Sequence, residues 1–94
     1  MQKKMVSAVQ VKLPGEEECR LEYYLCIAPG TYGMEITKKK SDTDEILESK
    51  ALPDVCCSFD CIMYMIRKLA NNTVTPMSLT EVMEVLLLET EDFH

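Results

Sequence analysis

The chain has 94 residues, 47% of them hydrophobic, which is enough for one domain with a single core but too little for two. No run approaches the roughly 20 apolar residues that a membrane-spanning helix needs, and the N-terminal stretch lacks the apolar segment of a secretion signal. The formal net charge of −6 excludes a general nucleic-acid binder, which needs a basic surface.

Alternating apolar and polar residues predict three β-strands in the first part of the chain. These strands cover about residues 5–13, 19–28 and 32–38, and the turn signals Pro14-Gly15 and Pro29-Gly30 separate them.

Alternation also assigns side chains to the two faces of the predicted sheet. Met5 and Tyr23 fall on the buried face, so Tyr24 must point away from the core. Gly33 has no side chain to pack and indicates a bulge or a close backbone approach.

The segment Lys38–Asp44 is too polar to bury and predicts a loop. Its run Lys38-Lys39-Lys40 suits contact with a phosphate or an acidic partner, but the acidic surroundings favour a solvated loop. Residues 46–52 predict a short fourth strand at a sheet edge, which Pro53 ends.

Residues 58–71 and 78–90 predict two helices joined by a polar turn. Ser58 suits the N-cap of the first, and Asn71-Asn72 ends it, because Asn tolerates the left-handed conformation. Ser78-Leu79-Thr80-Glu81 is a capping box for the second helix, with one tight turn at Thr75-Pro76 before it.

Apolar residues at helical spacing predict the buried side of each helix. For the first helix they are Phe59, Ile62, Met63, Ile66, Leu69 and Ala70. For the second they are Leu79, Val82, Met83, Leu86 and Phe93, with Val85 and Leu87 at the margins and a hydrophobic staple between Met77 and Val82.

Strands followed by helices predict one α+β domain over residues 1–94. We expect an antiparallel β-meander of three to four strands followed by two C-terminal α-helices packed on one sheet face.

The five cysteines are an odd number, which favours free thiols in a reducing cytoplasm over a disulfide framework. Cys56, Cys57 and Cys61 cluster where the first helix begins, and the helix dipole there can favour a Cys57 thiolate. A redox switch and a soft metal site are therefore alternatives to the interpretation that we favour, buried structural thiols. The terminal His94 is the sole histidine, which argues against the metal.

Other patterns that carry chemistry elsewhere are incomplete in this chain. Glu81 and Glu84 share a helical face but have no histidine or lysine beside them, so they predict a solvated face. A DNA-reading helix pair is rejected, because the turn is long and the second helix has no lysine or arginine. We find no catalytic constellation and no cofactor motif, so we expect a protein that is not an enzyme.

A row of small and aromatic residues on the outward sheet face predicts an interface with another protein. Its members are Val6, Ala8, Tyr24, Cys26 and Ala28. A homodimer through this face or through the sheet edge is our expectation, and a monomer with one solvated sheet face is the alternative.

Two short motifs resemble a family of small uncharacterised proteins from anaerobic Gram-positive bacteria. The segment Tyr32–Ile36 is similar to its YGIEI-like strand, and Val74–Glu84 is similar to its VTPxxLxDVIED-like C-terminal helix. The chain has Glu81 where that pattern has Asp, and Val85 where a second acid is usual. The resemblance implies a bacterial cytoplasmic protein and supplies no activity, because the family is a domain of unknown function.

These observations favour a small non-enzymatic interaction or regulatory module with an unknown protein partner, itself included, and no nucleic acid or membrane. The alternative is a thiol-based redox or metal-responsive protein centred on Cys56, Cys57 and Cys61.

Overall fold

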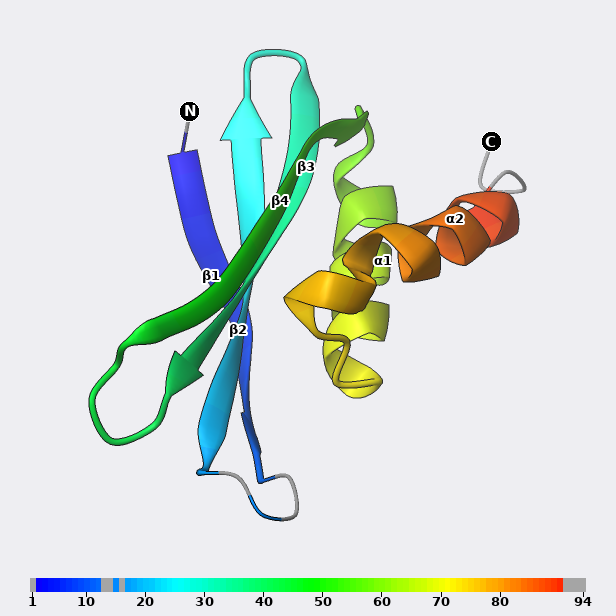
Figure 1. Cartoon of the computed structure of the whole chain (residues 1–94). Coiled ribbons are helices and arrows are strands. Elements are labelled where there is room, and N and C mark those ends of the chain that lie inside the picture. The colour runs from blue at the N-terminus through cyan, green and yellow to red at the C-terminus, as the bar shows by residue number, and fades with distance from the viewer. Residues whose placement is uncertain (1, 13–14, 16, 91–94) are drawn as a thin grey trace.

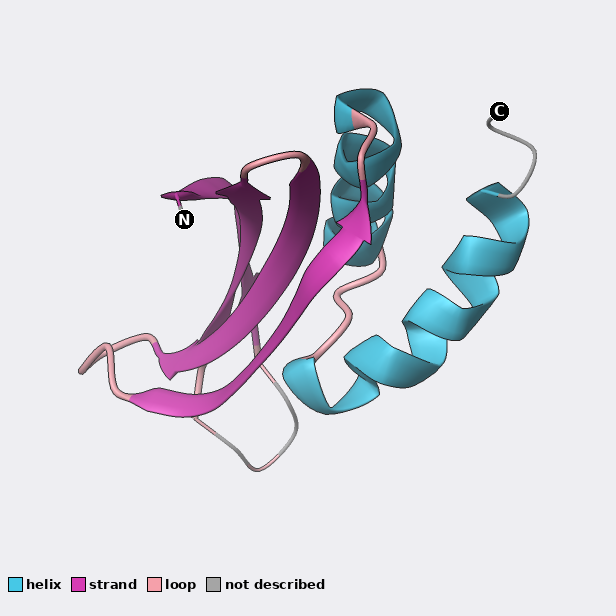
Figure 2. Cartoon of the chain, turned by 90° about the horizontal axis from the view of Figure 1, so that it is seen from above, coloured by secondary structure: helices cyan, strands magenta, loops and turns pink. Residues whose placement is uncertain are grey.

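The fold is a four-stranded antiparallel sheet followed by two α-helices, seen in a computed structural model that describes residues 2–12, 15 and 17–90. The strands, in the sheet order β1-β2-β3-β4, are β1 (Gln2–Val11), β2 (Cys19–Ala28), β3 (Thr31–Lys40) and β4 (Ile46–Cys56). The helices are α1 (Phe59–Asn71), the short 3₁₀ helix η1 (Pro76–Ser78) and α2 (Leu79–Thr90). Both α-helices lie on the same side of the sheet (Figures 1 and 2), which confirms the predicted α+β architecture.

We call the sheet face toward the helices the inner face and the opposite one the outer face. The bounds of β2 agree with the prediction. β1 begins earlier than predicted, at Gln2, and ends earlier, at Val11, because Lys12 already lies outside the strand; Leu13 is outside the described residues.

Two predicted strand ends are wrong, because cross-strand pairing extends both strands. β3 continues through Lys38–Lys40, which pair with Cys19–Leu21 of β2, so the three lysines belong to a strand and not to a loop. β4 continues through Pro53 to Cys56. A proline is tolerated there, because β4 is an edge strand and its outer side has no ladder bond to lose.

A β-bulge at Val6 changes which residues of β1 face the core. The register shifts between Met5, which pairs with Tyr24, and Ser7, which pairs with Tyr23. Directly paired residues share a face, so Met5 points outward beside Tyr24, whereas Val6 packs against the core. Regular alternation predicts the reverse for both residues and is wrong here, because the bulge inserts one extra residue.

Gly33 lies at a second irregularity, as the sequence indicated. The β3–β4 register shifts between Tyr32 and Met34. A Cβ atom at position 33 would lie 2.8 Å from the Pro53 Cα and would also collide with the Leu52 carbonyl. β3 and the edge strand β4 therefore approach each other at a point where only glycine fits.

The core fills the space between the inner face and the helices. Its largest side chain, Tyr23, is fully buried, and its hydroxyl donates a hydrogen bond to the Val74 carbonyl at 2.9 Å. Tyr24 points to the outer face, as predicted. The other buried core residues include Leu21, Leu25, Met34, Ile36, Ile62, Met65, Ile66, Leu69, Leu79, Met83 and Leu86.

The start of α1 is confirmed and its end differs in detail. The Ser58 hydroxyl accepts a hydrogen bond from the Cys61 N–H at 3.2 Å. At the other end, Asn72 has φ −101° and its side-chain amide donates to the Lys68 carbonyl at 2.7 Å. The left-handed residue is Thr73, with φ 49°. The prediction that asparagine supplies this conformation is wrong, because Asn72 caps the helix with its side chain.

Two apolar residues near the helix starts, Phe59 and Met77, depart from their predicted places. Phe59 is half-exposed, and its ring packs edge-on against Tyr32 with the ring centroids 5.9 Å apart. The predicted tight turn before α2 is η1, but Met77 within it is 80% exposed, so it forms no staple over Val82. Phe93 lies outside the described residues.

Candidate functional site

The three clustered cysteines meet at the junction of β4 and α1. Cys56 ends β4, Cys57 is exposed, and Cys61 is buried in the first turn of α1. Burial raises the pKa of the Cys56 thiol; a backbone hydrogen bond with Ser58 opposes this rise, and the neighbouring Cys61 thiol adds to it. Cys56 is therefore less reactive than an ordinary thiol at neutral pH.

The structure does not gather these thiols into a metal site. Among the described residues, no three side chains of histidine, cysteine, aspartate or glutamate are placed to hold one ion. All five cysteines are free, and Cys19, Cys26 and Cys61 are buried. This arrangement agrees with small hydrophobic side chains at the buried positions.

The predicted outward row does not lie on one face as a whole. Ala8 is exposed, and Tyr24, Cys26 and Ala28 alternate along the outer face of β2. Val6 packs against the core because of the bulge, so its predicted place in the row is wrong. Cys26 is also buried, although it belongs to the outer face. The row as a partner site stays a prediction.

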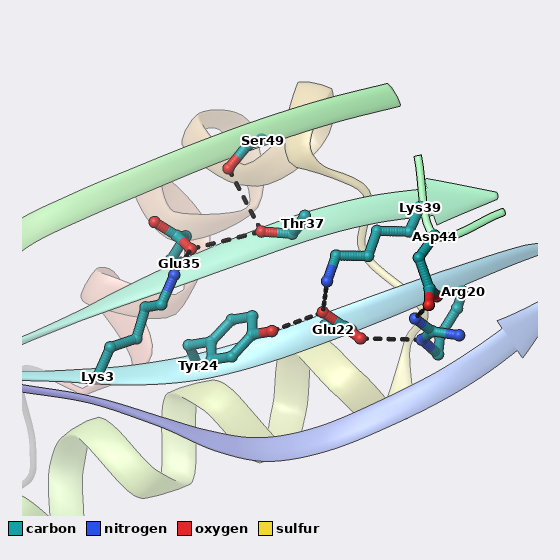
Figure 3. A network of polar contacts seen from close by, with 9 residues as sticks. All are labelled: Lys3, Arg20, Glu22, Tyr24, Glu35, Thr37, Lys39, Asp44 and Ser49. Carbon is teal, nitrogen blue, oxygen red and sulfur yellow. Dashed lines mark hydrogen bonds and ion pairs between the residues drawn. The ribbon is translucent and has the colours of Figure 1, made fainter. Parts of the chain in front are cut away.

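The outer face carries instead a network of polar contacts centred on Glu22 (Figure 3). Glu22 is only 3% exposed. It accepts a hydrogen bond from the Tyr24 hydroxyl at 2.5 Å and from the Arg20 Nε at 2.9 Å, and it lies 3.0 Å from the Lys39 ammonium. Sequence reasoning missed this cluster, because it placed Lys39 in a loop.

These contacts fix the ionisation of the cluster. Burial alone would raise the pKa of Glu22, but hydrogen bonds from Tyr24, Lys39 and Arg20 outweigh it and lower the pKa to about 2. Burial and the same carboxylate raise the pKa of Tyr24 to about 12. Glu22 is thus a weak base and Tyr24 a weak acid at neutral pH, so neither suits acid–base catalysis.

Further ion pairs extend the network toward the rim of the face. Arg20 also pairs with Asp44 in the loop between β3 and β4. Lys3 lies 2.8 Å from Glu35 and stacks over the Tyr24 ring, 4.6 Å from its centroid. In the part of the chain that the structure describes, no buried side-chain nitrogen or oxygen lacks a hydrogen-bond partner. The buried polar groups of the outer face therefore find their hydrogen-bond partners within the chain.

Helix α2 presents the opposite kind of surface. We define its outer row as Val82, Val85 and Leu88, which follow one another at three-residue spacing. Val85 is 57% exposed and Leu88 is 66% exposed, whereas Val82 is half-buried. Leu79, Met83 and Leu86 on the other side of the helix are buried in the core, so α2 is apolar on two sides at once.

A groove runs beside the outer row, between α2 and the end of α1. Val82, Val85 and Leu86 line it from α2. Lys68 and Asn72 line it from α1. No helix in the described residues is both long enough and apolar enough to cross a membrane. Apart from Leu87, which is 45% exposed, the exposed apolar side chains of α2 belong to the outer row, and the groove runs along one edge of this row.

Comparison with known proteins identifies a family. A family model described as "Family of unknown function (DUF6514)" matches residues 2–89. No curated protein and no solved structure matches the chain.

Proposed function

Because the chain belongs to the DUF6514 family, whose function is unknown, we propose its role from its surfaces: a non-enzymatic module that binds another protein through the outer row of α2. The observation that carries the proposal is the exposure of Val85 and Leu88 on a helix whose other side already fills the core. Exposed apolar rows beside a groove are typical of protein-binding surfaces.

The charge of the chain supports a protein partner over a nucleic acid. The net charge is −6, and the part of α2 around the outer row carries Glu81 and Glu84 but no lysine or arginine. A phosphate backbone would be repelled by these carboxylates.

The electrostatics of the outer sheet face support a role without catalysis. The deeply buried carboxylate of Glu22 is held by two cations and a tyrosine, and its pKa of about 2 keeps it ionised and hydrogen-bonded at neutral pH. Such a group stabilises the sheet and is poorly suited to take a proton from a substrate.

The proposal places the protein in the cytoplasm of an anaerobic Gram-positive bacterium. Five free cysteines suit a reducing compartment. The Tyr32–Ile36 and Val74–Glu84 motifs support the bacterial source.

A photo-crosslinking residue at position 88 tests the binding surface in living cells. We expect a discrete crosslinked product at position 88, and none from the same residue at position 50, where the exposed Lys50 lies on β4. Equal crosslinking at the two positions, or none at either, would contradict the proposal.

The second candidate function is a thiol switch, favoured by the proximity of Cys56 to Cys61 beside the exposed Cys57. In such a switch, two thiols lose two electrons and two protons to form a disulfide, and glutathione disulfide is reduced to two glutathione molecules. We expect glutathione disulfide at neutral pH to give an intramolecular bond within this cluster, mapped by mass spectrometry. Glutathione on Cys57 alone would eliminate this candidate.

Alkylation gives an independent measurement of the same cluster. If it is a switch, one of Cys57 and Cys61 should react with N-ethylmaleimide much faster than the buried Cys19 in the native protein. A Cys57→Ser variant should then lose the fast phase if Cys57 carries it. Uniformly slow labelling that only denaturant releases would show structural thiols.

A further inference from the structure

The outer row of α2 has flanks of opposite charge. Glu81 and Glu84 lie on the side of Val85 that is away from the groove, about 40° and 100° round the helix from it, and Leu88 lies between them. On the other flank is the groove with Lys68, whose ammonium lies 5.7 Å from the Tyr64 ring centroid. Lys68, Glu81 and Glu84 are all exposed.

We propose that the partner of the outer row is a second copy of this chain, bound with the two α2 helices side by side and parallel. This inference rests on the proposed function and names its partner. The surface requires apolar contact in its centre, a cation along one edge and carboxylates along the other. A second copy supplies all three: the apolar row and the carboxylates from α2, and the cation from the end of α1.

Symmetry decides between the two possible orientations. A twofold axis that runs along two parallel helices brings the left flank of one against the right flank of the other, as in parallel coiled coils. Glu81 and Glu84 then face the partner copy's Lys68, and the outer rows meet in the middle. In an antiparallel pair each flank meets its own copy, so carboxylates would face carboxylates. Charge complementarity therefore favours the parallel pair.

The size of the row sets the strength of the pair. Three side chains over two helical turns make a small apolar centre, and exposed ion pairs add little affinity. The groove beside Val82 and Val85 adds room for the partner copy's side chains. We expect a dissociation constant in the micromolar range, so the dimer should form and dissociate with concentration.

Sedimentation equilibrium on the full chain tests the dimer and its surface. We expect twice the mass of one chain at high micromolar concentration. Leu88→Glu should weaken association by about tenfold or more, since it places a charge in the apolar centre. The matched control is Thr80→Glu, because Thr80 is exposed on a different side of the same helix. A dimer that Leu88→Glu leaves unchanged, or that Thr80→Glu weakens equally, would overturn the assigned surface.

One substitution distinguishes the two orientations, because it should change the strength of association in opposite directions. Glu84→Lys should weaken a parallel dimer, because it places a cation near the partner copy's Lys68, and adding Lys68→Glu should restore association. In an antiparallel dimer Glu84→Lys would strengthen association by removing repulsion between carboxylates. Glu18→Lys is the control for net charge, since Glu18 is exposed and distant in sequence. A stronger dimer in Glu84→Lys than in this control would overturn the parallel arrangement.

The same experiments separate this inference from the proposed function. A chain that stays monomeric at all concentrations, while position 88 crosslinks to a different protein in cells, overturns self-association and leaves the binding module standing. A monomer without any crosslink at position 88 overturns both.

Discussion

The outer sheet face and the outer row of α2 are two surfaces outside the core, and they are built in opposite ways. On the sheet, charged groups pair with one another, and Glu22 is nearly as buried as a core residue. On α2, Val85 and Leu88 expose more than half of their surface. Each square ångström of apolar surface that is later covered contributes about 25 cal/mol.

The contrast shows why residue type alone is a poor guide to a binding surface. Tyr24 on a solvated sheet looks like a contact residue, but its hydroxyl is held by Glu22 and its ring is covered by Lys3. Val85 looks like the margin of a core stripe, yet it faces the groove beside α1. A surface that satisfies its own groups has less to gain from a partner than an apolar row left in water.

The largest expected effect separates the two sides of α2. Leu86→Ala should cost about 2–5 kcal/mol, and Ile66→Ala on α1 the same, since both side chains are buried. Leu88→Ala should change the free energy of unfolding by about 0.5 kcal/mol or less, because the side chain is exposed. Urea denaturation at low protein concentration measures all three. A costly Leu88→Ala would mean that the row is covered within a single chain.

The next effect concerns the centre of the sheet network. Glu22→Gln should destabilise the fold by about 2–3 kcal/mol at pH 6, because Arg20 and Lys39 lose a charged acceptor. The folded pKa of Glu22, about 2, lies below the ordinary value of 4.5. Its contribution is therefore complete above pH 4.5 and is lost as the pH falls toward 2.

Urea midpoints at pH 6 and pH 3 check this prediction. Wild type should lose stability between the two, and Glu22→Gln should lose markedly less. Glu18→Gln, at an exposed position, should keep the wild-type profile. Parallel profiles for wild type and Glu22→Gln would show that the network does not hold Glu22 ionised.

Local signals in the sequence were sufficient for most of the architecture. Ser58 marks a helix start by its own chemistry, and adjacent tyrosines on a strand must face opposite ways, so the placement of Tyr23 and Tyr24 follows. The bulge at Val6 carries no such signal, because the residues around it alternate acceptably in either register.

The Glu22 network depended on register, and a usable signal was present. The pairing of Ala28 with Thr31 across the turn Pro29-Gly30 fixes the β2–β3 register. Counting outward from that turn places Lys39 opposite Arg20, next to Glu22. Ending the predicted third strand at residue 38 concealed this pair. The buried side of α2 was predicted at Leu79, Met83 and Leu86, but the exposure of Val85 and Leu88 was not, because apolar residues extend beyond the core stripe of this helix.

The smallest expected effect lies at the rim of the sheet network. Lys3 bonds to Glu35 at 2.8 Å, but 48% of its side chain is exposed, so solvent screens the pair. Lys3→Met should change the free energy of unfolding by less than about 1 kcal/mol, and the difference should shrink in 1 M salt. The hydrogen bond from Lys3 to Glu35 raises the pKa of Lys3. Its contribution is therefore present below pH 10.5 and is lost as the pH rises through the raised value.

Urea denaturation of wild type, Lys3→Met and Glu22→Gln at increasing salt shows whether the rim or the centre of the network contributes more to stability. We expect the effect of Glu22→Gln to persist in 1 M salt, because burial shields that carboxylate from mobile ions. If Lys3→Met proved as costly as Glu22→Gln, the rim would hold the sheet face together. Its charges would then have to lie deeper than a 48% exposed side chain allows. A small, salt-sensitive effect of Lys3→Met would instead show that the contacts around Glu22 stabilise the sheet face. The outer row of α2 would then remain the surface that gains from a partner.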